Sequence, residues 1–243
     1  MNGMTIFYIS ISILLIALSL GLGLGLGLGL KNDDKSDDDK SDNETKDRLN
    51  VVYINLDKHV DRNEQILGEI KEFSSNYNRL SATYNEKGYL GCAMSHIRCL
   101  EYAIKNNLEH YLVLEDDFTF VRNKNEVYDE INTFIDNEKD WDVLLLSCNK
   151  EKRENHSDIV DKVKNSQTTS GFLVNKYYYQ KLLNNFRTAY KQLEKTDNQN
   201  RFSIDMYWKL LQETDNWFVL KKVAGIQRES YRDIEKKTVN YGV

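Results

Sequence analysis

The stretch 111–117 reads Tyr-Leu-Val-Leu-Glu-Asp-Asp, and it decides the fold prediction. The apolar run 111–114 predicts a strand covered on both faces, because a half-exposed strand would alternate apolar and polar residues. Three carboxylates follow at once, at the carboxyl end of that strand. In open α/β sheets, ligands bind beyond the carboxyl ends of the strands. The residues that directly follow each apolar run are therefore the first candidates for a functional site.

Two other apolar runs resemble this one, at residues 51–56 and 143–146. Between the runs, apolar residues recur at the spacing of amphipathic helices. The helical positions are Ile66, Leu67, Ile70 and Phe73 in one segment and Ala93, Ile97, Leu100 and Ile104 in the next. Strands that alternate with helices predict an α/β domain with a mostly parallel central sheet.

The composition limits the classes of function. The 243-residue chain has a formal net charge of −5, whereas a partner with a phosphate backbone would need a basic face. We therefore expect no nucleic-acid partner. Three cysteines are too few for a disulfide framework, and Cys92 and Cys99 would lie about 10 Å apart on one helix, too far to bond.

The N-terminal 30 residues carry no charged side chain. As a helix, residues 5–30 would be about 39 Å long, enough to cross a hydrocarbon core of about 30 Å. A cleaved signal peptide is the alternative, but it would have a basic N-terminal segment, a shorter apolar region and a small-residue cleavage site. We predict an uncleaved transmembrane signal anchor over residues 1–30, so that the chain is attached to a membrane.

Residues 31–48 predict a disordered acidic linker, because eight acidic and five basic residues occur there without any aromatic or aliphatic side chain. The folded domain is expected over residues 49–243.

The acidic triplet has two interpretations. Adjacent carboxylates repel one another unless a cation neutralises them, and hard oxygen ligands suit Mg²⁺ or Mn²⁺. A solvated acidic turn is the other interpretation. The position of the triplet directly after a predicted buried strand makes a cation site a serious candidate.

Four ordered blocks give the domain a resemblance to glycosyltransferase family 25, which includes bacterial lipooligosaccharide galactosyltransferases and collagen galactosyltransferases. The blocks are Val52-Tyr53-Ile54-Asn55-Leu56-Asp57 with Asp61-Arg62; Gly91-Cys92-Ala93-Met94-Ser95-His96; residues 112–117; and Trp141-Asp142-Val143-Leu144-Leu145. Weaker similarity covers residues 168–174, Ile204-Asp205-Met206-Tyr207-Trp208, and Gln227-Arg228 with Tyr231 and Asp233-Ile234-Glu235.

The resemblance implies a nucleotide-sugar-binding fold of the GT-A type and transfer of a hexose, galactose or glucose, from a UDP-sugar. The acceptor would be a hydroxyl of a glycan or protein, and the cofactor Mn²⁺ or Mg²⁺. The triplet takes the place of the family's acidic motif, usually written Asp-X-Asp, with Glu115 in place of the first Asp. Glu115 and Asp117 would then hold the metal, which stabilises the departing diphosphate.

Other matched residues receive donor-binding roles by the same resemblance. Arg62 could contact the diphosphate through its guanidinium. Asn55 and Asp57 could read the nucleoside, although a turn and a helix cap would equally explain Asp57. Asp116 and Gln227 complete the expected donor site.

Ser95 and His96 lie early in a predicted helix whose start could present backbone amides to an anion. Zinc is a rival prediction, because Cys92, His96 and Cys99 share a helix face and Cys148 could be a fourth ligand.

Asp205 is the candidate general base. An inverting transferase needs a group that takes the proton of the acceptor hydroxyl, and Asp205 begins a segment in which Met206, Leu210 and Leu211 are expected to face inward. A helix-start residue favoured by the helix dipole is the alternative.

Two other functions remain open. A metal-dependent phosphohydrolase could use the same triplet, and an anchored sugar-binding module could keep the fold without turnover. The scattered histidines provide no further pair at metal-ligand spacing, which weighs against the hydrolase.

The side of the membrane is predicted from two opposing arguments. Lys31, Lys35 and Lys40 follow the anchor and no basic residue precedes it, which by the positive-inside rule favours a cytosolic domain. Relatives with an anchor commonly act in the secretory lumen, and glycosylation sequons begin at Asn43 and Asn155. We predict a lumenal glycoprotein.

Overall fold

The computed structural model describes residues 46–228, 230–232 and 237–239. The predicted anchor and residues 31–45 of the predicted linker lie outside these ranges, as does the segment around Asp233. Within the described residues, no helix combines the length and the apolar character that crossing a membrane requires.

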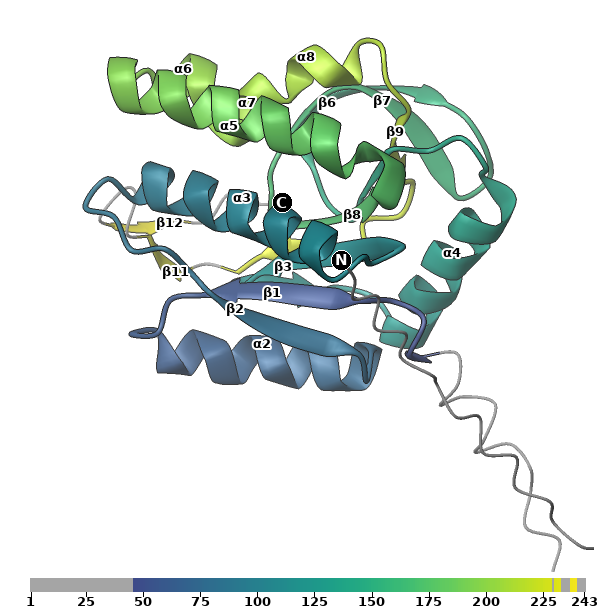
Figure 1. Cartoon of the computed structure of the whole chain (residues 1–243). Helices are drawn as coiled ribbons and strands as arrows, with labels where there is room; N and C mark the ends of the chain where they lie inside the picture. Colours follow the sequence, from purple (N-terminus) through teal and green to yellow (C-terminus); the bar gives the residue numbers. More distant parts are fainter. Residues whose placement is uncertain (1–45, 229, 233–236, 240–243) are drawn as a thin grey trace, which may run out of the picture. The chain divides into compact units, whose positions relative to one another are not determined.

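An eight-stranded sheet forms the centre of the domain, with the strand order β2-β1-β3-β8-β5-β9-β7-β6 (Figure 1). Its strands are β1 (Val51–Asn55), β2 (Tyr77–Ser81), β3 (His110–Glu115), β5 (Val143–Leu145), β6 (Asn149–Asn155), β7 (Val160–Gln167), β8 (Gly171–Asn175) and β9 (Trp217–Leu220). β1 pairs in parallel with β2 and β3, and β5 pairs in parallel with β9. The strands β7 and β8 run against the other six. The predicted α/β fold with a mostly parallel sheet is confirmed, and the sheet is mixed.

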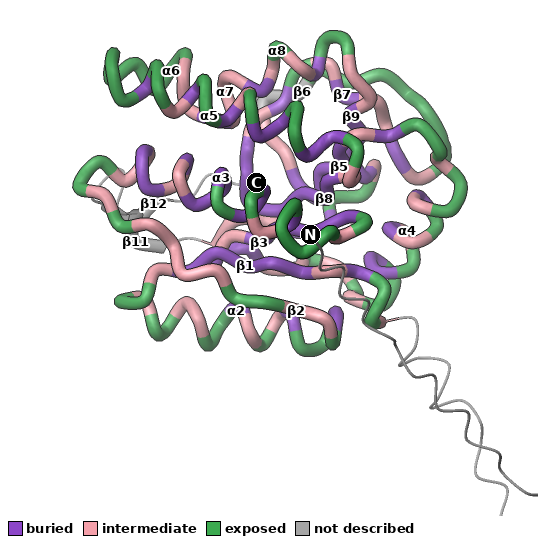
Figure 2. Tube along the Cα trace, viewed as in Figure 1, coloured by how far each residue is buried: buried purple, intermediate pink, exposed green. Residues whose placement is uncertain are grey.

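Helices cover both faces of the sheet. α2 (Val60–Phe73) and α4 (Lys124–Asn137) pack on one face, while α3 (Gly88–Lys105) and α5 (Tyr179–Thr196) pack on the other. Neighbouring residues of one strand supply the two cores, since Val51 belongs to the α2 side and Val52 to the α3 side. Figure 2 shows the buried strands between the half-exposed helices. Burial on both faces is the reason why the strands read as continuous apolar runs.

Shorter elements complete the domain. They are the 3₁₀ helix η1 (Lys176–Tyr178), the helices α6 (Gln199–Phe202), α7 (Ile204–Tyr207) and α8 (Lys209–Gln212), and the two-stranded ladders β4 (Phe118–Phe120) with β10 (Gly225–Gln227) and β11 (Ser230–Arg232) with β12 (Lys237–Val239).

Two predicted core positions are wrong. Ile104 is 41% exposed and Leu210 is 58% exposed. Ile104 lies in the last turn of α3. The segment that follows Asp205 is two short helices with a break at Trp208, so a single helical period does not extend to Leu210. Trp208 takes the core position instead and is fully buried.

The ladder of β4 and β10 brings a distant part of the chain to the end of β3. Gln227 pairs with Phe118, and the amide of Arg228 donates to the carbonyl oxygen of Asp117 at 2.7 Å. The ring of Phe118 occupies the space that side chains at Gly171 and Gly225 would fill, because a Cβ there would come within 2.8 and 2.1 Å of it. Two glycines thus allow the chain to close around the residues that follow β3.

Candidate active site

The three carboxylates of the acidic triplet have different surroundings. Glu115 is the last residue of β3, and its Oε1 accepts hydrogen bonds from His96 Nε2 at 3.0 Å and Thr169 Oγ1 at 2.6 Å. Its Oε2 accepts one from Gln227 Nε2 at 3.3 Å. Three residues that the sequence placed in the site, Glu115, His96 and Gln227, therefore meet, although they come from β3, α3 and β10.

Asp116 is buried and bound to the end of β1. Its Oδ2 accepts from Asn55 Nδ2 at 2.8 Å, and its Oδ1 pairs with Arg62 at 3.1 Å. The sequence placed all three residues in the donor site, with Arg62 at the diphosphate and Asn55 at the nucleoside, and did not predict these contacts among them. The guanidinium of Arg62 pairs with Asp116, a carboxylate of the protein itself.

Asp117 is 2% exposed and lies beside a second guanidinium. Arg228 donates from its backbone to the Asp117 carbonyl and from its side chain to the Asp116 carbonyl at 2.6 Å. Burial lowers the pKa of Arg228, and the charges of Asp117, Glu69 and Asp116 act in the opposite direction. Arg228 was not among the residues assigned a role from the sequence, although it adjoins Gln227 in the same block.

Asn55 and Asp57 both bind Arg79. The amide oxygen of Asn55 accepts from Arg79 at 2.8 Å, and the Asn55 amide nitrogen donates to His59 as well as to Asp116. Asp57 accepts from Arg79 at 2.7 Å, and this hydrogen bond lowers the pKa of Asp57. Asn55 therefore ties the ends of β1, β2 and β3 together, and Asp57 anchors the end of β2.

Ser95 and His96 face different partners from neighbouring positions of α3. Ser95 Oγ accepts from the backbone amide of Thr83 at 2.9 Å and donates to the Gly91 carbonyl at 2.7 Å. His96 is 1% exposed, and its ring stacks on Phe172 with centroids 5.7 Å apart. Ser95 thus holds the loop after β2, while His96 holds Glu115.

Asp205 lies in the first turn of α7, within electrostatic reach of Glu115. Burial raises the pKa of its carboxyl, and the charge of Glu115 raises it further. Its Oδ2 faces the backbone amide of Thr168 at 3.4 Å. Thr168 has a φ of 92°, a left-handed conformation that a β-branched residue rarely adopts and that tends to occur at functional sites.

The predicted zinc quartet does not form. Among the described side chains, Cys92 and His96 meet Glu115, with ligand atoms within 4.8 Å of one another. Cys99 belongs to the hydrophobic core instead. Burial raises the pKa of the Cys92 thiol well above its ordinary value, and neighbouring carboxylates raise it further, which disfavours the thiolate that zinc requires.

A pocket at the carboxyl edge of the sheet unites most of the predicted residues. Asn55, Arg62, Ser95, His96 and the acidic triplet line it, together with His59, Thr83, Tyr84 and Gly91. Asp57, Asp205 and Gln227 are not in its lining. The pocket adjoins the ends of β1 and β3, where the topology predicts a ligand site.

The oxygen donors fit a hard divalent cation. Because Glu115 Oε1 already accepts from His96, Thr169 and, at 4.0 Å, the Cys92 thiol, a cation would meet Glu115 through Oε2, on the side of Gln227. Asp117 adds a second, buried carboxylate. Asp116 is engaged by Arg62 and Asn55 and is the least suited of the three to ligate a metal.

The family model described as glycosyltransferase family 25 (LPS biosynthesis protein) matches residues 86–206. The matched segment contains Ser95, His96, the acidic triplet and Asp205, and the resemblance drawn from the sequence blocks is confirmed. No curated protein matches the chain.

Solved structures share the arrangement of elements only distantly. A glycosyltransferase involved in the glycosylation of the major capsid of PBCV-1 is 12% identical, with a TM-score of 0.46, over 76% of this chain and 95% of that one. A mannose-1-phosphate geranyltransferase from Thermus thermophilus is 8% identical, with a TM-score of 0.42, over 70% of this chain. The glycosyltransferase GlyE of Streptococcus pneumoniae is 12% identical, with a TM-score of 0.42, also over 70%. This chain spans 58% of the Thermus protein and 44% of GlyE, and similarity at this level carries no argument about function.

Proposed function

With its family identified as glycosyltransferase family 25, we propose that this chain transfers a hexose, galactose or glucose, from a UDP-sugar to a hydroxyl of a glycan or protein acceptor. The observation that carries the proposal is that Glu115 and Asp117 line one pocket at the edge of the sheet and that Gln227 hydrogen-bonds Glu115. A solvated acidic turn would leave these side chains exposed, whereas Asp117 is buried and Glu115 is hydrogen-bonded on both oxygens.

Glu115 and Asp117 would hold Mn²⁺ or Mg²⁺. When bound, such a cation supplies positive charge that stabilises the diphosphate as it departs. His96 and Thr169 fix the Glu115 carboxylate in one orientation through Oε1. Arg228 lies beside Asp117 with its guanidinium half-buried, and it adds positive charge next to this carboxylate.

The transfer itself joins the acceptor oxygen to the anomeric carbon of the sugar and breaks the bond between that carbon and the phosphate oxygen. The electron pair of the broken bond goes to UDP, and the hydroxyl proton goes to a base. We assign the base to Asp205, whose raised pKa suits a group that must accept a proton. Attack from the face opposite the departing UDP would invert the anomeric configuration.

Membrane attachment through residues 1–30 and a lumenal position of the domain are part of the proposal. Asn155 ends β6 and is exposed, so it is accessible to the glycosylation machinery if the domain enters the lumen. Treatment with a glycosidase after expression in a eukaryotic cell tests the position. A mobility shift supports the lumen, and the absence of a shift together with exposure to cytosolic protease contradicts it.

Release of UDP from UDP-galactose and UDP-glucose, with Mn²⁺ and mixed glycan acceptors, tests the function. Acceptor-dependent release supports a transferase. Release of phosphate from simple phosphate esters without a sugar donor would favour the phosphohydrolase. Tight binding of glycans without any release would favour a sugar-binding module.

A further inference from the structure

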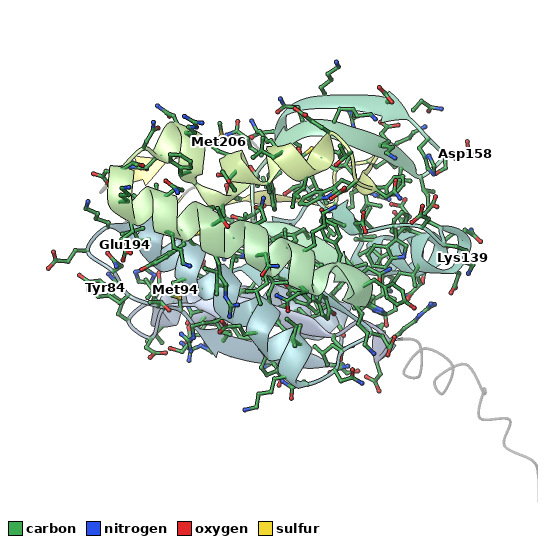
Figure 3. The ribbon with its side chains drawn as sticks, turned by 45° about the horizontal axis from the view of Figure 1, so that its top comes forward. Tyr84, Met94, Lys139, Asp158, Glu194 and Met206 are labelled. Atoms are coloured by element: carbon green, nitrogen blue, oxygen red, sulfur yellow. The ribbon has the colours of Figure 1, made fainter. Side chains whose placement is uncertain are left out.

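Tyr84 is an exposed aromatic side chain in the lining of the pocket that contains the acidic triplet. Two aromatic side chains in the described part of the chain are exposed, Tyr84 at 66% and Tyr177 at 90%. Tyr84 lines the pocket that contains the acidic triplet, whereas Tyr177 follows β8, at the end of β3 away from the triplet. Figure 3 shows Tyr84 at the rim of the domain, on the same side as Met94 of α3. No role was predicted for Tyr84 from the sequence.

The loop that carries Tyr84 is fastened to α3. The Thr83 amide donates to Ser95 Oγ at 2.9 Å, and Arg98 donates to Ser81 and Thr83 at 2.9 and 3.2 Å. The loop lies so close to the helix that a Cβ on Gly91 would come within 2.5 Å of the Thr83 carbonyl. The backbone that leads into Tyr84 is thus held in place while its ring remains open to solvent.

The rest of the pocket divides into an apolar and a charged part. Leu56 and Ala82 line it together with Tyr84. The charged Lys58 Nζ lies over the Tyr84 ring at 5.3 Å from the centroid, so a base that stacks there displaces Lys58 or uses the other face of the ring. Arg62 and the acidic triplet supply the charged part. An apolar part with an aromatic ring fits a planar heterocycle, and the charged part fits a diphosphate with its cation.

We propose that Tyr84 is the stacking platform for the nucleobase of the donor. This inference rests on the proposed function and adds to it the orientation of the donor, with the base at Tyr84 and the diphosphate at the acidic triplet. Stacking on an aromatic face accepts any planar base, so Tyr84 contributes affinity and orientation rather than a choice among bases.

Because the loop that carries Tyr84 is already held in place, little conformational entropy of the protein is lost when a nucleotide binds. The ring is already presented by a loop bonded to α3, so the nucleotide need not order a mobile segment. Ser95, which the sequence placed in the donor site, then acts through the loop that it holds rather than by direct contact.

Calorimetric titration of the full-length protein with UDP and with inorganic pyrophosphate, both in the presence of Mn²⁺, tests the platform. We expect Tyr84→Ala to weaken UDP binding about 5- to 100-fold, because base stacking on one aromatic side chain contributes on the order of that factor. Pyrophosphate has no base, so its affinity should stay within about twofold of wild type. Tyr84→Phe keeps the ring and should bind UDP as wild type does. Tyr177→Ala removes the other exposed ring, which lies outside the pocket, and should change neither affinity.

The outcomes separate this inference from the function on which it rests. UDP binding by Tyr84→Ala that equals wild type overturns the platform and leaves the transferase proposal intact. An equal loss of UDP and pyrophosphate binding also overturns it, because the residue would then support the phosphate part or the fold. A wild-type protein that binds UDP no better than pyrophosphate contradicts a base contribution of any kind. Absence of UDP binding by wild type contradicts the proposed function and the platform together.

Discussion

Replacing Arg62 with methionine should destabilise the domain far more than loss of an ordinary surface ion pair. The Arg62 and Asp116 side chains are only 14% and 10% exposed, with 3.1 Å between the paired atoms. Removing one partner of a buried pair costs about 3–5 kcal/mol, because the other charge stays buried without it. Asp116 would still accept from Asn55 at 2.8 Å, and His59 Nδ1 lies 3.9 Å away. Because these contacts remain, we expect Arg62→Met to lower the free energy of unfolding by about 2–4 kcal/mol, somewhat less than the full cost of breaking a buried pair.

A double-mutant cycle isolates the pair from the shape of the side chains. Arg62→Met, Asp116→Asn and the double variant would be unfolded in urea and followed by tryptophan fluorescence, since Trp208 and Trp217 are fully buried. The double variant removes both charges of the pair, so it should recover most of the stability that Arg62→Met loses. The coupling free energy between the two residues should be at least about 1.5 kcal/mol.

Arg48 and Asp136 provide the matched control. They form a two-pronged ion pair at 3.0 and 2.6 Å, but their side chains are 38% and 60% exposed. Solvent screens such a pair, and its coupling free energy should be much smaller than that of Arg62 with Asp116. Equal coupling in the two cycles, or a coupling below about 0.5 kcal/mol for Arg62 with Asp116, would refute the reasoning from burial.

Substitutions at three other positions, with Gly68→Ala as a control, test the site and its support. Asp117→Asn should lower the rate of transfer at least about 100-fold. The melting temperature should be unchanged or raised, because repulsion between carboxylates is relieved. Strong destabilisation with activity retained per folded molecule would contradict this prediction. Asp205→Asn should lower kcat about 100- to 10,000-fold with little change in the donor KM. The raised pKa of Asp205 means that its protonated form stabilises the fold at low pH and that this contribution is lost as pH rises through the folded pKa. The Asn variant should therefore gain stability over wild type at neutral pH but not in acid, and a gain independent of pH would contradict the assignment. Gly91→Ala should lower the free energy of unfolding by about 1–3 kcal/mol, because its Cβ would meet the Thr83 carbonyl. Gly68→Ala in α2, where nothing lies within 4 Å, should raise it by about 0.5–1 kcal/mol. Urea unfolding that ranks the two variants the other way would show that the loop at Thr83 can move aside.

The sheet could be predicted where its strands are buried on both faces. Residues 51–54, 111–114 and 143–145 are apolar throughout, and each stretch lies in a strand of the central sheet. The hairpin of β6 and β7 was not predicted, because its charged sequence carries no strand period. The antiparallel direction of β8 also escaped prediction, since a short apolar run contains no information about which way its strand runs.

The site could be predicted where residues follow a strand directly, as Glu115 and Asp117 do. Gln227 was found only through the family resemblance, because it reaches Glu115 through the ladder of β4 and β10. Thr169 and Arg79 were missed, since a single polar residue in a loop or a strand does not reveal its partner. Tyr84 was missed for a related reason: its exposure depends on how the loop packs on α3.

Calorimetric titration of UDP into the full-length protein, with Mn²⁺ and again with a chelator, tests the central claim most directly. If the residues after β3 form a metal-dependent diphosphate site, Mn²⁺ should tighten UDP binding by at least about tenfold, because one cation contact with the diphosphate contributes well over about 1.4 kcal/mol. Asp117→Asn should remove that difference while the fold persists. Equal affinity with Mn²⁺ and with chelator would contradict the account, because the buried acidic triplet would then have no part in binding the donor.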